Sequence, residues 1–181
     1  YVIFRDSEGH VWFGTHVLGV CRFDGTAFAW AAKTELGFDE DDNFGLRSIA
    51  QDKDDKFWFS NTLNRFDIQS PVHNTSAGQA NSTLSVRKEP GIIRPVDPKK
   101  DHPTLFMSSV KDKNGDLWLV TLRSGVWRYD GTILTPYPVM DGGAIVTLCS
   151  IYQDNEGVLW LGTHEHGVYK FNGTTFERFR G

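Results

Sequence analysis

Apolar and polar positions follow one repeating order in four segments of the chain. Each segment holds a polar turn that starts with Asp, a short apolar stretch with Trp, a polar loop and a second apolar stretch. The three clean copies start at Asp6, Asp112 and Asp154 and read DSEGHVWFGTHVLGVCRFDGT, DKNGDLWLVTLRSGVWRYDGT and DNEGVLWLGTHEHGVYKFNGT. A degenerate copy starts at Asp52, with Asp55 in place of the turn glycine. Recurrence of this kind predicts a repeat architecture.

Each copy predicts four short β-strands, because its apolar stretches are brief, rich in β-branched and aromatic residues, and bounded by Gly, Asn or Asp. The Asp-x-x-Gly segment predicts a tight turn whose carboxylate accepts backbone N–H groups. Asn172-Gly173 predicts a hairpin turn, as does the Asp-Gly pair of the other clean copies. Four strands joined in this way form an antiparallel meander of about 40 residues, the size of a propeller blade. In the last copy the expected strands are 147–153, 158–163, 167–171 and 175–179.

The sequence therefore predicts an all-β fold, a four-bladed β-propeller of four-stranded antiparallel blades in one domain, 1–181. Packing between neighbouring blades would bury roughly 150–250 Å² of each second-strand Trp. Closure of the ring is favoured because it covers both end blades. The alternative is an open fragment of a larger propeller, in which the first and last blades each expose an aromatic face. The expected blades are about 1–32, 46–100, 104–139 and 144–180, and their Trp residues are Trp12, Trp58, Trp118 and Trp160.

The second copy departs from the pattern after its third strand. Residues from about 69 to 101 hold much of the chain's proline and read as an irregular insertion, which is either functional or merely tolerated. The fourth strand of this blade is expected at Leu84–Lys88 or at Gly91–Val96 within that insertion.

The string I-x-x-D-x-x-G-x-L-W-L-G-T…G-V-Y-x-F-N-G, which begins at Ile151, resembles the two-component-regulator propeller repeat. In that family many such repeats form the periplasmic sensor of bacterial hybrid histidine kinases. The resemblance covers the chain except about 69–101, and it implies a bacterial, periplasmic or extracellular protein with a sensor-type role. The residues that recur are structural ones, so the resemblance indicates the fold more than the chemistry.

The composition argues against several classes of function. The net charge is -4 and no basic stripe exists, so nucleic acid is not an expected partner. No apolar run reaches the roughly 18 residues of a membrane span. The chain begins inside a predicted strand and shows no signal peptide, which is expected of a mature product or a fragment. Cys21 and Cys149 are expected to be free and buried, and no cofactor is predicted.

Candidate binding residues lie in the loops between second and third strands, since equivalent loops of a propeller emerge on one face. Three interpretations stay open for these residues. They form a binding face for a polar or carbohydrate-like ligand, or His16, His164 and His166 hold a metal ion, or they are ordinary solvated loop residues. The predicted ring of side chains consists of His16, Asn61, Arg123, His164, Glu165 and His166.

The leading hypothesis is a non-catalytic ligand-binding or sensor-type module, with carbohydrate or oligosaccharide as the candidate ligand. The second is a structural or protein-assembly module that contacts a protein partner or a second copy. The third is a polysaccharide lyase or hydrolase on a propeller scaffold. No catalytic residue is predicted, because no nucleophile or metalloprotease motif occurs and the repeated Asp residues are turn residues.

Overall fold

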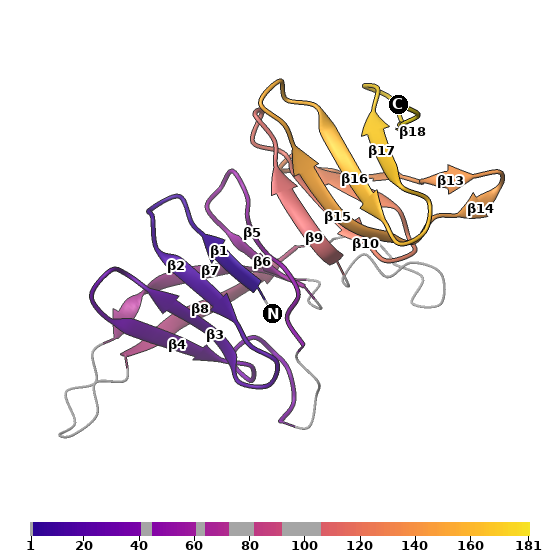
Figure 1. Ribbon diagram of the computed structural model, residues 1–181. Helices are drawn as coiled ribbons and strands as arrows, with labels where there is room; N and C mark the ends of the chain where they lie inside the picture. Colours follow the sequence, from indigo (N-terminus) through magenta and orange to yellow (C-terminus); the bar gives the residue numbers. More distant parts are fainter. Residues whose placement is uncertain (1, 41–44, 61–63, 73–81, 92–105) are drawn as a thin grey trace. The chain divides into compact units, whose positions relative to one another are not determined.

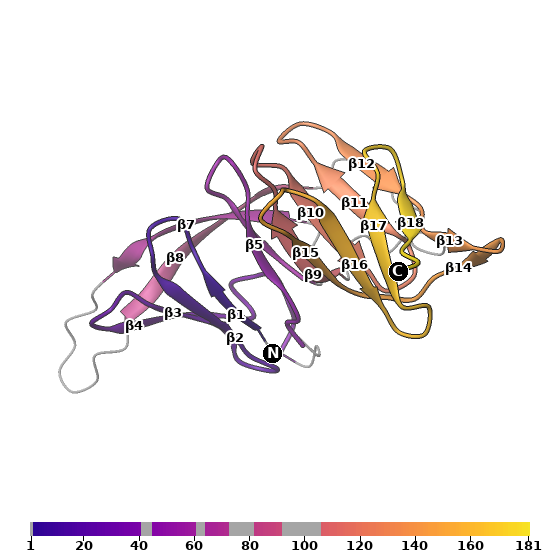
Figure 2. The same cartoon turned by 45° about the horizontal axis from the view of Figure 1, so that its top comes forward.

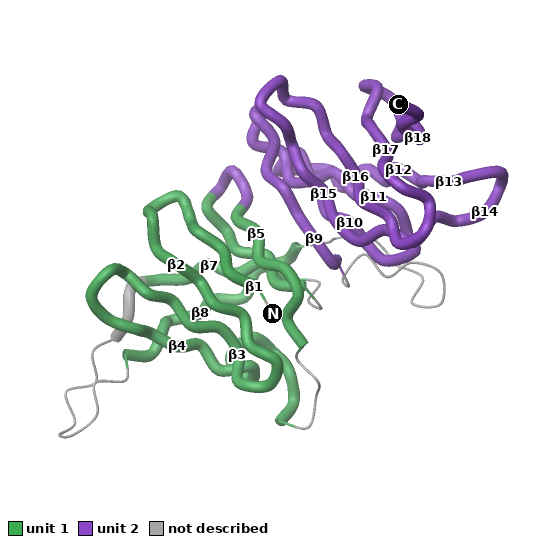
Figure 3. Tube along the Cα trace, viewed as in Figure 1, with its two compact units in different colours: residues 1–51, 55–91 green, residues 52–54, 92–181 purple. Residues whose placement is uncertain are grey.

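The computed structural model describes residues 2–40, 45–60, 64–72, 82–91 and 106–181. These residues form strands, turns and loops, with no helix among them, so the predicted all-β class is confirmed. The chain divides into two compact units, which are described separately (Figure 3). Unit 1 comprises 1–51 and 55–91, and unit 2 comprises 52–54 and 92–181.

Unit 1 contains the first two repeats. Repeat 1 is an antiparallel meander of four strands, and repeat 2 is a second one. Their fourth strands, β4 and β8, pair in parallel through Ala29↔Ser82 and Trp30↔Thr83. This pairing joins the two repeats into one eight-stranded sheet, which the sequence did not indicate (Figure 1). The strands are β1 (Val2–Arg5), β2 (Val11–Gly14), β3 (Gly19–Phe23), β4 (Phe28–Ala32), β5 (Ile49–Gln51), β6 (Phe57–Phe59), β7 (Asn64–Val72) and β8 (Ser82–Pro90).

The second repeat is more regular than its sequence suggested. β7 runs to Val72 and pairs with β8 over most of its length, so both strands enter the stretch that was expected to be irregular. β8 contains the first of the two expected fourth strands, Leu84–Lys88. The rest of the expected insertion, including most of the alternative strand, lies outside the described residues. Asp55, in place of the turn glycine, adopts a left-handed φ of 59°.

Unit 2 contains repeats 3 and 4, each of which is a separate four-stranded antiparallel sheet. The first strands of the two sheets, β9 and β15, lie side by side (Figures 1 and 2). A short hairpin, β13–β14, connects the repeats through a turn at Gly142 and Gly143, both with positive φ. The strands are β9 (Phe106–Lys111), β10 (Leu117–Thr121), β11 (Val126–Tyr129), β12 (Leu134–Tyr137), β13 (Met140–Asp141), β14 (Ala144–Ile145), β15 (Leu148–Gln153), β16 (Leu159–Thr163), β17 (Val168–Phe171) and β18 (Phe176–Arg178).

One apolar core lies in each unit, because the strands alternate apolar residues onto the faces that meet. In unit 1 the core includes Trp12 with Phe57, Phe59 and Phe66. In unit 2 it includes Trp118 of repeat 3 together with Leu161, Tyr169 and Phe176 of repeat 4. The Trp of one repeat is therefore covered by the following repeat in both units, as the interblade packing hypothesis expected.

The Asp-x-x-Gly turns are built as predicted, with one bond that was not foreseen. Oδ1 of Asp154 accepts the backbone N–H groups of Glu156 and Val158 at 3.0 and 2.8 Å. Oδ2 of the same carboxylate accepts the indole Nε1–H of Trp160 at 2.7 Å. Asp6 and Asp112 make the same three bonds in their repeats. One carboxylate thus ties the turn to the Trp that packs between repeats.

The cysteines correct one expectation. Cys21 is free and buried, but Cys149 is free and exposed. A register shift between Leu148 and Ser150 breaks the alternation at the start of β15, which explains why Cys149 does not face the core. The part of the chain that the structure describes holds no helix long and apolar enough to cross a membrane.

Candidate functional site

The loops between second and third strands share one backbone design in repeats 1, 3 and 4. Each begins with Thr and ends four residues later with a positive-φ Gly. In repeat 4 the hydroxyl of Thr163 donates to the carbonyl of Gly167 at 2.7 Å and accepts the backbone N–H of His166 at 2.9 Å. The same threonine bonds occur in the other two loops. The three residues inside each loop are therefore carried on a fixed frame, the arrangement typical of variable binding tips.

The tips of these loops differ widely in chemistry. Repeat 1 presents His16, Val17 and Leu18, and all three are exposed. Repeat 3 presents Leu122, Arg123 and Ser124, and repeat 4 presents His164, Glu165 and His166. One tip is thus largely apolar, one carries a guanidinium group and one carries two imidazoles and a carboxylate.

Within unit 2 the structure brings two predicted tips to the same end of the unit. The carbonyl of Leu122 accepts the backbone N–H of Leu148 at 3.1 Å. The preceding residue, Thr147, accepts the backbone N–H of His164 at 3.0 Å through its carbonyl. Arg123 directly follows the bonded Leu122, and His164 is itself one of the bonded residues. The two side chains therefore belong to neighbouring loops, both of which are hydrogen-bonded to the segment Thr147–Leu148.

The predicted histidines of repeat 4 are not equivalent. His164 is exposed, and its Nδ1 lies 3.4 Å from Oε1 of Glu165. His166 is half-buried, and its Nδ1 is buried without a hydrogen-bond partner in the described part of the chain. No group of three His, Cys, Asp or Glu side chains suited to a metal ion occurs among the described residues. The metal interpretation of His16, His164 and His166 stays a prediction, as does the polar-ligand interpretation.

Two members of the predicted ring lie outside the described part of unit 2. His16 lies in unit 1, where the backbone N–H of Gly45 donates to its carbonyl at 2.8 Å. Asn61 lies outside the described residues. The ring of six side chains stays a prediction.

A cavity of about 280 Å³ lies at the opposite end of repeats 3 and 4, beside the Asp-containing turns. Its polar side chains include Lys113, Asn114, Arg128 and Gln153, and Leu159 is among its apolar ones. The Gln153 amide donates to the carbonyl of Gly157 at 3.0 Å. This second candidate surface was missed, because it depends on two sheets meeting rather than on any motif.

A row of side chains across each sheet was also missed. Arg22, Arg128 and Lys170 stand directly opposite Trp12, Trp118 and Trp160 on the neighbouring strand, ten residues after each Trp. Their charged groups lie 5.9, 5.6 and 5.2 Å from the indole centroids. A basic residue at this fixed spacing is a signal that the sequence contained, and it indicates a cation–π contact in repeats 1, 3 and 4.

The electrostatics of the turns support a structural role for the repeated Asp residues. The indole N–H of Trp160, followed by the backbone N–H of Val158, lowers the pKa of Asp154. In Asp6, burial alone would raise the pKa, but the bonds from Trp12 and His10 together lower it. A carboxylate held ionised by such donors is poorly suited to act as a general acid.

Comparisons with known proteins place the fold in the β-propeller class. Residues 142–165 match the family model described as "Two component regulator propeller", which confirms the resemblance in the last repeat. The match starts at the β13–β14 turn and ends in the loop that carries His164 and Glu165. Comparison with curated proteins gave no match.

Three solved structures show the fold over 98% of the chain. The extracellular domain of a hybrid two-component system from B. thetaiotaomicron is 21% identical, with a TM-score of 0.65 and 22% of that chain covered. The extracellular domain of a one-component system from the same organism is 21% identical, with a TM-score of 0.58 and 24% covered. Virginiamycin B lyase from Staphylococcus aureus is 13% identical, with a TM-score of 0.66 and 54% covered. The chain spans about a quarter or less of the sensor ectodomains it resembles.

Proposed function

We propose that this chain is a non-catalytic, ligand-binding part of a sensor-type propeller, located in the periplasm or outside the cell. The observation that carries the proposal is the Thr-x-x-x-Gly loop, which keeps one backbone frame and varies its tip. Structural loops have no need of this combination, whereas a recognition surface requires a rigid frame and variable side chains. The two-component ectodomains among the structural neighbours support a sensor role.

The chemistry of the tips favours a polar ligand such as a carbohydrate. The guanidinium group of Arg123 offers several hydrogen-bond donors in a plane, and each imidazole of His164 and His166 can donate or accept. Glu165 adds a carboxylate acceptor that is 75% exposed. Hydroxyl-rich ligands need such a mixture of donors and acceptors, because each sugar hydroxyl both donates and accepts.

The number of blades belongs to the proposal as well. The closed four-bladed ring and the open part of a larger propeller both agree with separate four-stranded repeats. The sequence favours the closed ring because it covers both end sheets, and the open part of a larger propeller is the alternative. A closed ring would cover the last sheet as repeat 4 covers repeat 3.

A thermal-shift panel of oligosaccharides tests the binding proposal, since a ligand that binds the folded state raises the melting temperature. The decisive variants are Arg123→Ala and His164→Ala, which alter exposed tips and leave the threonine frame intact. The matched control is Lys113→Ala with Gln153→Ala, at the cavity beside the turns. A shift that disappears only in the tip variants supports the proposal. A shift that disappears only in the control pair transfers the site to the cavity, and no shift with any glycan contradicts carbohydrate binding.

The lyase or hydrolase hypothesis is tested in the same panel. Virginiamycin B lyase shares the fold at 13% identity, which carries no inference about activity here. Chain-shortened or unsaturated products after prolonged incubation would replace the binding proposal with an enzymatic one. A melting shift without products supports a non-catalytic binder.

A further inference from the structure

The cavity between repeats 3 and 4 has a buried apolar floor and an exposed polar mouth. Trp118 of β10 and Leu159 of β16 line it and are only 3% and 4% exposed. Lys113 and Asn114, from the turn between β9 and β10, line it as well and are exposed. Its volume of about 280 Å³ lies just below the range of roughly 300–1,000 Å³ that is usual for ligand pockets. A ligand with one ring or a short carbon chain is therefore of suitable size.

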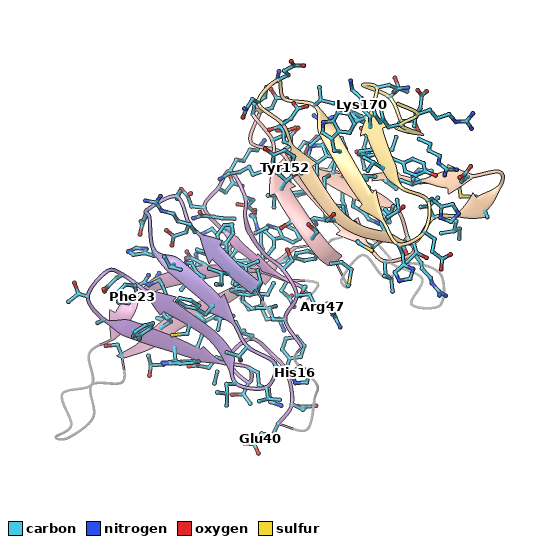
Figure 4. All side chains as sticks on the ribbon, viewed as in Figure 1. His16, Phe23, Glu40, Arg47, Tyr152 and Lys170 are labelled. Carbon is cyan, nitrogen blue, oxygen red and sulfur yellow. The ribbon has the colours of Figure 1, made fainter. Side chains whose placement is uncertain are left out.

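Both walls of the cavity, the sheets of repeats 3 and 4, belong to unit 2 (Figure 3). Gln153 and Leu159 stand directly opposite each other on β15 and β16, on the face that meets repeat 3. Tyr152 and Lys170, which Figure 4 labels, lie on the other face of this sheet, because successive residues of a strand alternate between faces. Any repeat that packs on that other face leaves the cavity unchanged.

In unit 1 an aromatic ring occupies the position that Leu159 holds in unit 2. Phe57 follows the turn Asp of repeat 2 by five residues, as Leu159 follows Asp154 in repeat 4. The ring of Phe57 lies against Trp12, the counterpart of Trp118, with the centroids 4.5 Å apart. Leucine has no ring to place against the indole. The cavity beside Trp118 therefore lies where unit 1 has an aromatic side chain.

The turns beside this position also differ between the two units. In unit 1 the backbone N–H of Ser7 donates to Oε1 of Gln51 at 2.8 Å, which joins the turn of repeat 1 to repeat 2. In unit 2 Lys113 stands in place of Ser7 and makes no hydrogen bond or ion pair with the described residues. Gln153 stands in place of Gln51 and donates within its own repeat. Repeats 3 and 4 thus leave the mouth of the cavity open at the point where repeats 1 and 2 are bonded together.

The carboxylate at the cavity is already hydrogen-bonded, whereas two donors are not. Oδ1 of Asp112 accepts two backbone N–H groups of its own turn, at 2.8 and 3.0 Å, and Oδ2 accepts the indole N–H of Trp118 at 2.9 Å. The guanidinium group of Arg128 is bonded to a carboxylate of its own repeat. The ammonium group of Lys113 and the side-chain amide of Asn114 have no hydrogen-bond partner among the described residues. The open mouth therefore offers donors and a positive charge to a ligand.

We propose that this cavity binds a small organic monocarboxylate, with its ring or carbon chain on Leu159 and its carboxylate on Lys113. An ammonium group and a carboxylate form charge-assisted hydrogen bonds, and burial of the apolar part against the floor adds to the affinity. A second negative charge on the ligand would lie near the carboxylate of Asp112, so a monoanion fits better than a phosphate dianion. The cavity and the loop tips lie at opposite ends of repeats 3 and 4, so this binding does not depend on the ligand of the tips.

A titration with benzoate, followed by NMR spectroscopy of the nitrogen-15-labelled chain, tests the proposal. We expect benzoate to shift the indole N–H resonance of Trp118, which lines the cavity, and to leave that of Trp160, on the other face of its sheet, unchanged. Benzamide has nearly the same shape without the charge and should bind about tenfold or more weakly. A Trp118 resonance that does not move with benzoate overturns the proposal, as does equal affinity for the two compounds.

Three variants locate the site. Lys113→Met should weaken benzoate binding by about tenfold, whereas Lys170→Met removes an exposed ammonium group from the other face of the repeat 4 sheet and should bind as the wild type does. Leu159→Phe places in the cavity the ring that Phe57 places beside Trp12, and it should abolish binding. Equal losses in the two lysine variants, or binding that persists in Leu159→Phe, contradict the proposed site. Far-UV circular dichroism checks the fold, and Val158→Phe takes the place of Leu159→Phe if that variant unfolds.

Discussion

Trp118 and Trp160 occupy the same position in consecutive repeats, yet one is a core residue and the other lies at a half-open surface. Both donate an indole N–H to the turn Asp, at 2.9 and 2.7 Å, and both lie beside a basic side chain and an aromatic ring of their own sheet. They differ in the following repeat, which covers Trp118 with Phe171 and Phe176. The comparison separates what a repeat provides for itself from what only its neighbour provides.

The largest expected effect comes from truncating the two Trp residues. Trp118→Ala should lower the free energy of unfolding by about 3–5 kcal/mol, because it removes a buried ring and leaves a cavity. Trp160→Ala should cost about 1–2 kcal/mol, mainly for the lost indole bond and partial packing. Both variants lose the same bond to Asp, so urea unfolding of the dilute protein isolates the contribution of the following repeat. Equal losses would contradict the comparison.

A smaller effect is expected at the loop glycines. Both Gly125 and Gly167 have positive φ, of 75° and 77°. A Cβ at Gly125 would lie 2.5 Å from the carbonyl oxygen of Tyr137, whereas nothing lies within 4 Å of one at Gly167. We expect Gly125→Ala to cost about 2–4 kcal/mol and Gly167→Ala about 1 kcal/mol, the latter for backbone strain alone. Thermal melts of the two variants make the test, and a larger loss in Gly167→Ala would show that the outer strand does not confine the loop.

Replacing the basic residues beside the two indoles should give a smaller difference in the free energy of unfolding. Nε of Arg128 donates to Oδ2 of Asp116 at 2.8 Å, and Asp116 is buried. Arg128→Met leaves that carboxylate unpaired and should cost about 1–3 kcal/mol. Lys170→Met removes an exposed cation from an indole face and should cost about 0.5 kcal/mol. Chemical denaturation of both variants, with Ile133→Ser as a surface control, measures the difference; equal costs would mean that Asp116 finds another partner.

The smallest expected effect is on the pH dependence of stability in acid. Because Trp160 and Val158 lower the pKa of Asp154 below its ordinary value of 3.8, the unfolded chain binds the proton more readily than the folded one. The stability from this carboxylate is complete above that value and is lost as the pH falls through the lower pKa of the folded state. Asp154→Asn should flatten the fall in urea midpoint between about pH 5 and about pH 3. An unchanged slope would mean that Trp160 does not stabilise the charged form.

Several local features could be predicted because their causes are local. The strands of repeat 4 lie within about one residue of their expected limits, since Asp-x-x-Gly and Asn-Gly turns specify where each strand ends. The candidate loops were found for the same reason, as they lie between predictable strands. The residue types at the loop tips were enough to name the candidate binding residues. The backbone hydrogen bonds through Thr147 and Leu148 could not be predicted, because they form only when two repeats pack together.

Other features depended on contacts between distant segments. The parallel pairing of β4 with β8 joins residues more than fifty positions apart, and no turn signal specifies it. The exposed Cys149 follows from a register shift that alternation of residue types does not reveal. The cavity beside Lys113 and Gln153 forms where two sheets meet.

The amino-acid sequence alone determined the meander, its turns, the place of each Trp and the side chains at the loop tips, because neighbouring residues control backbone turns and strand alternation. The tertiary structure alone decided which of those Trp residues is covered. Burial is a property of two surfaces in contact, and the repeated strings of residues do not record whether a following sheet is packed against them.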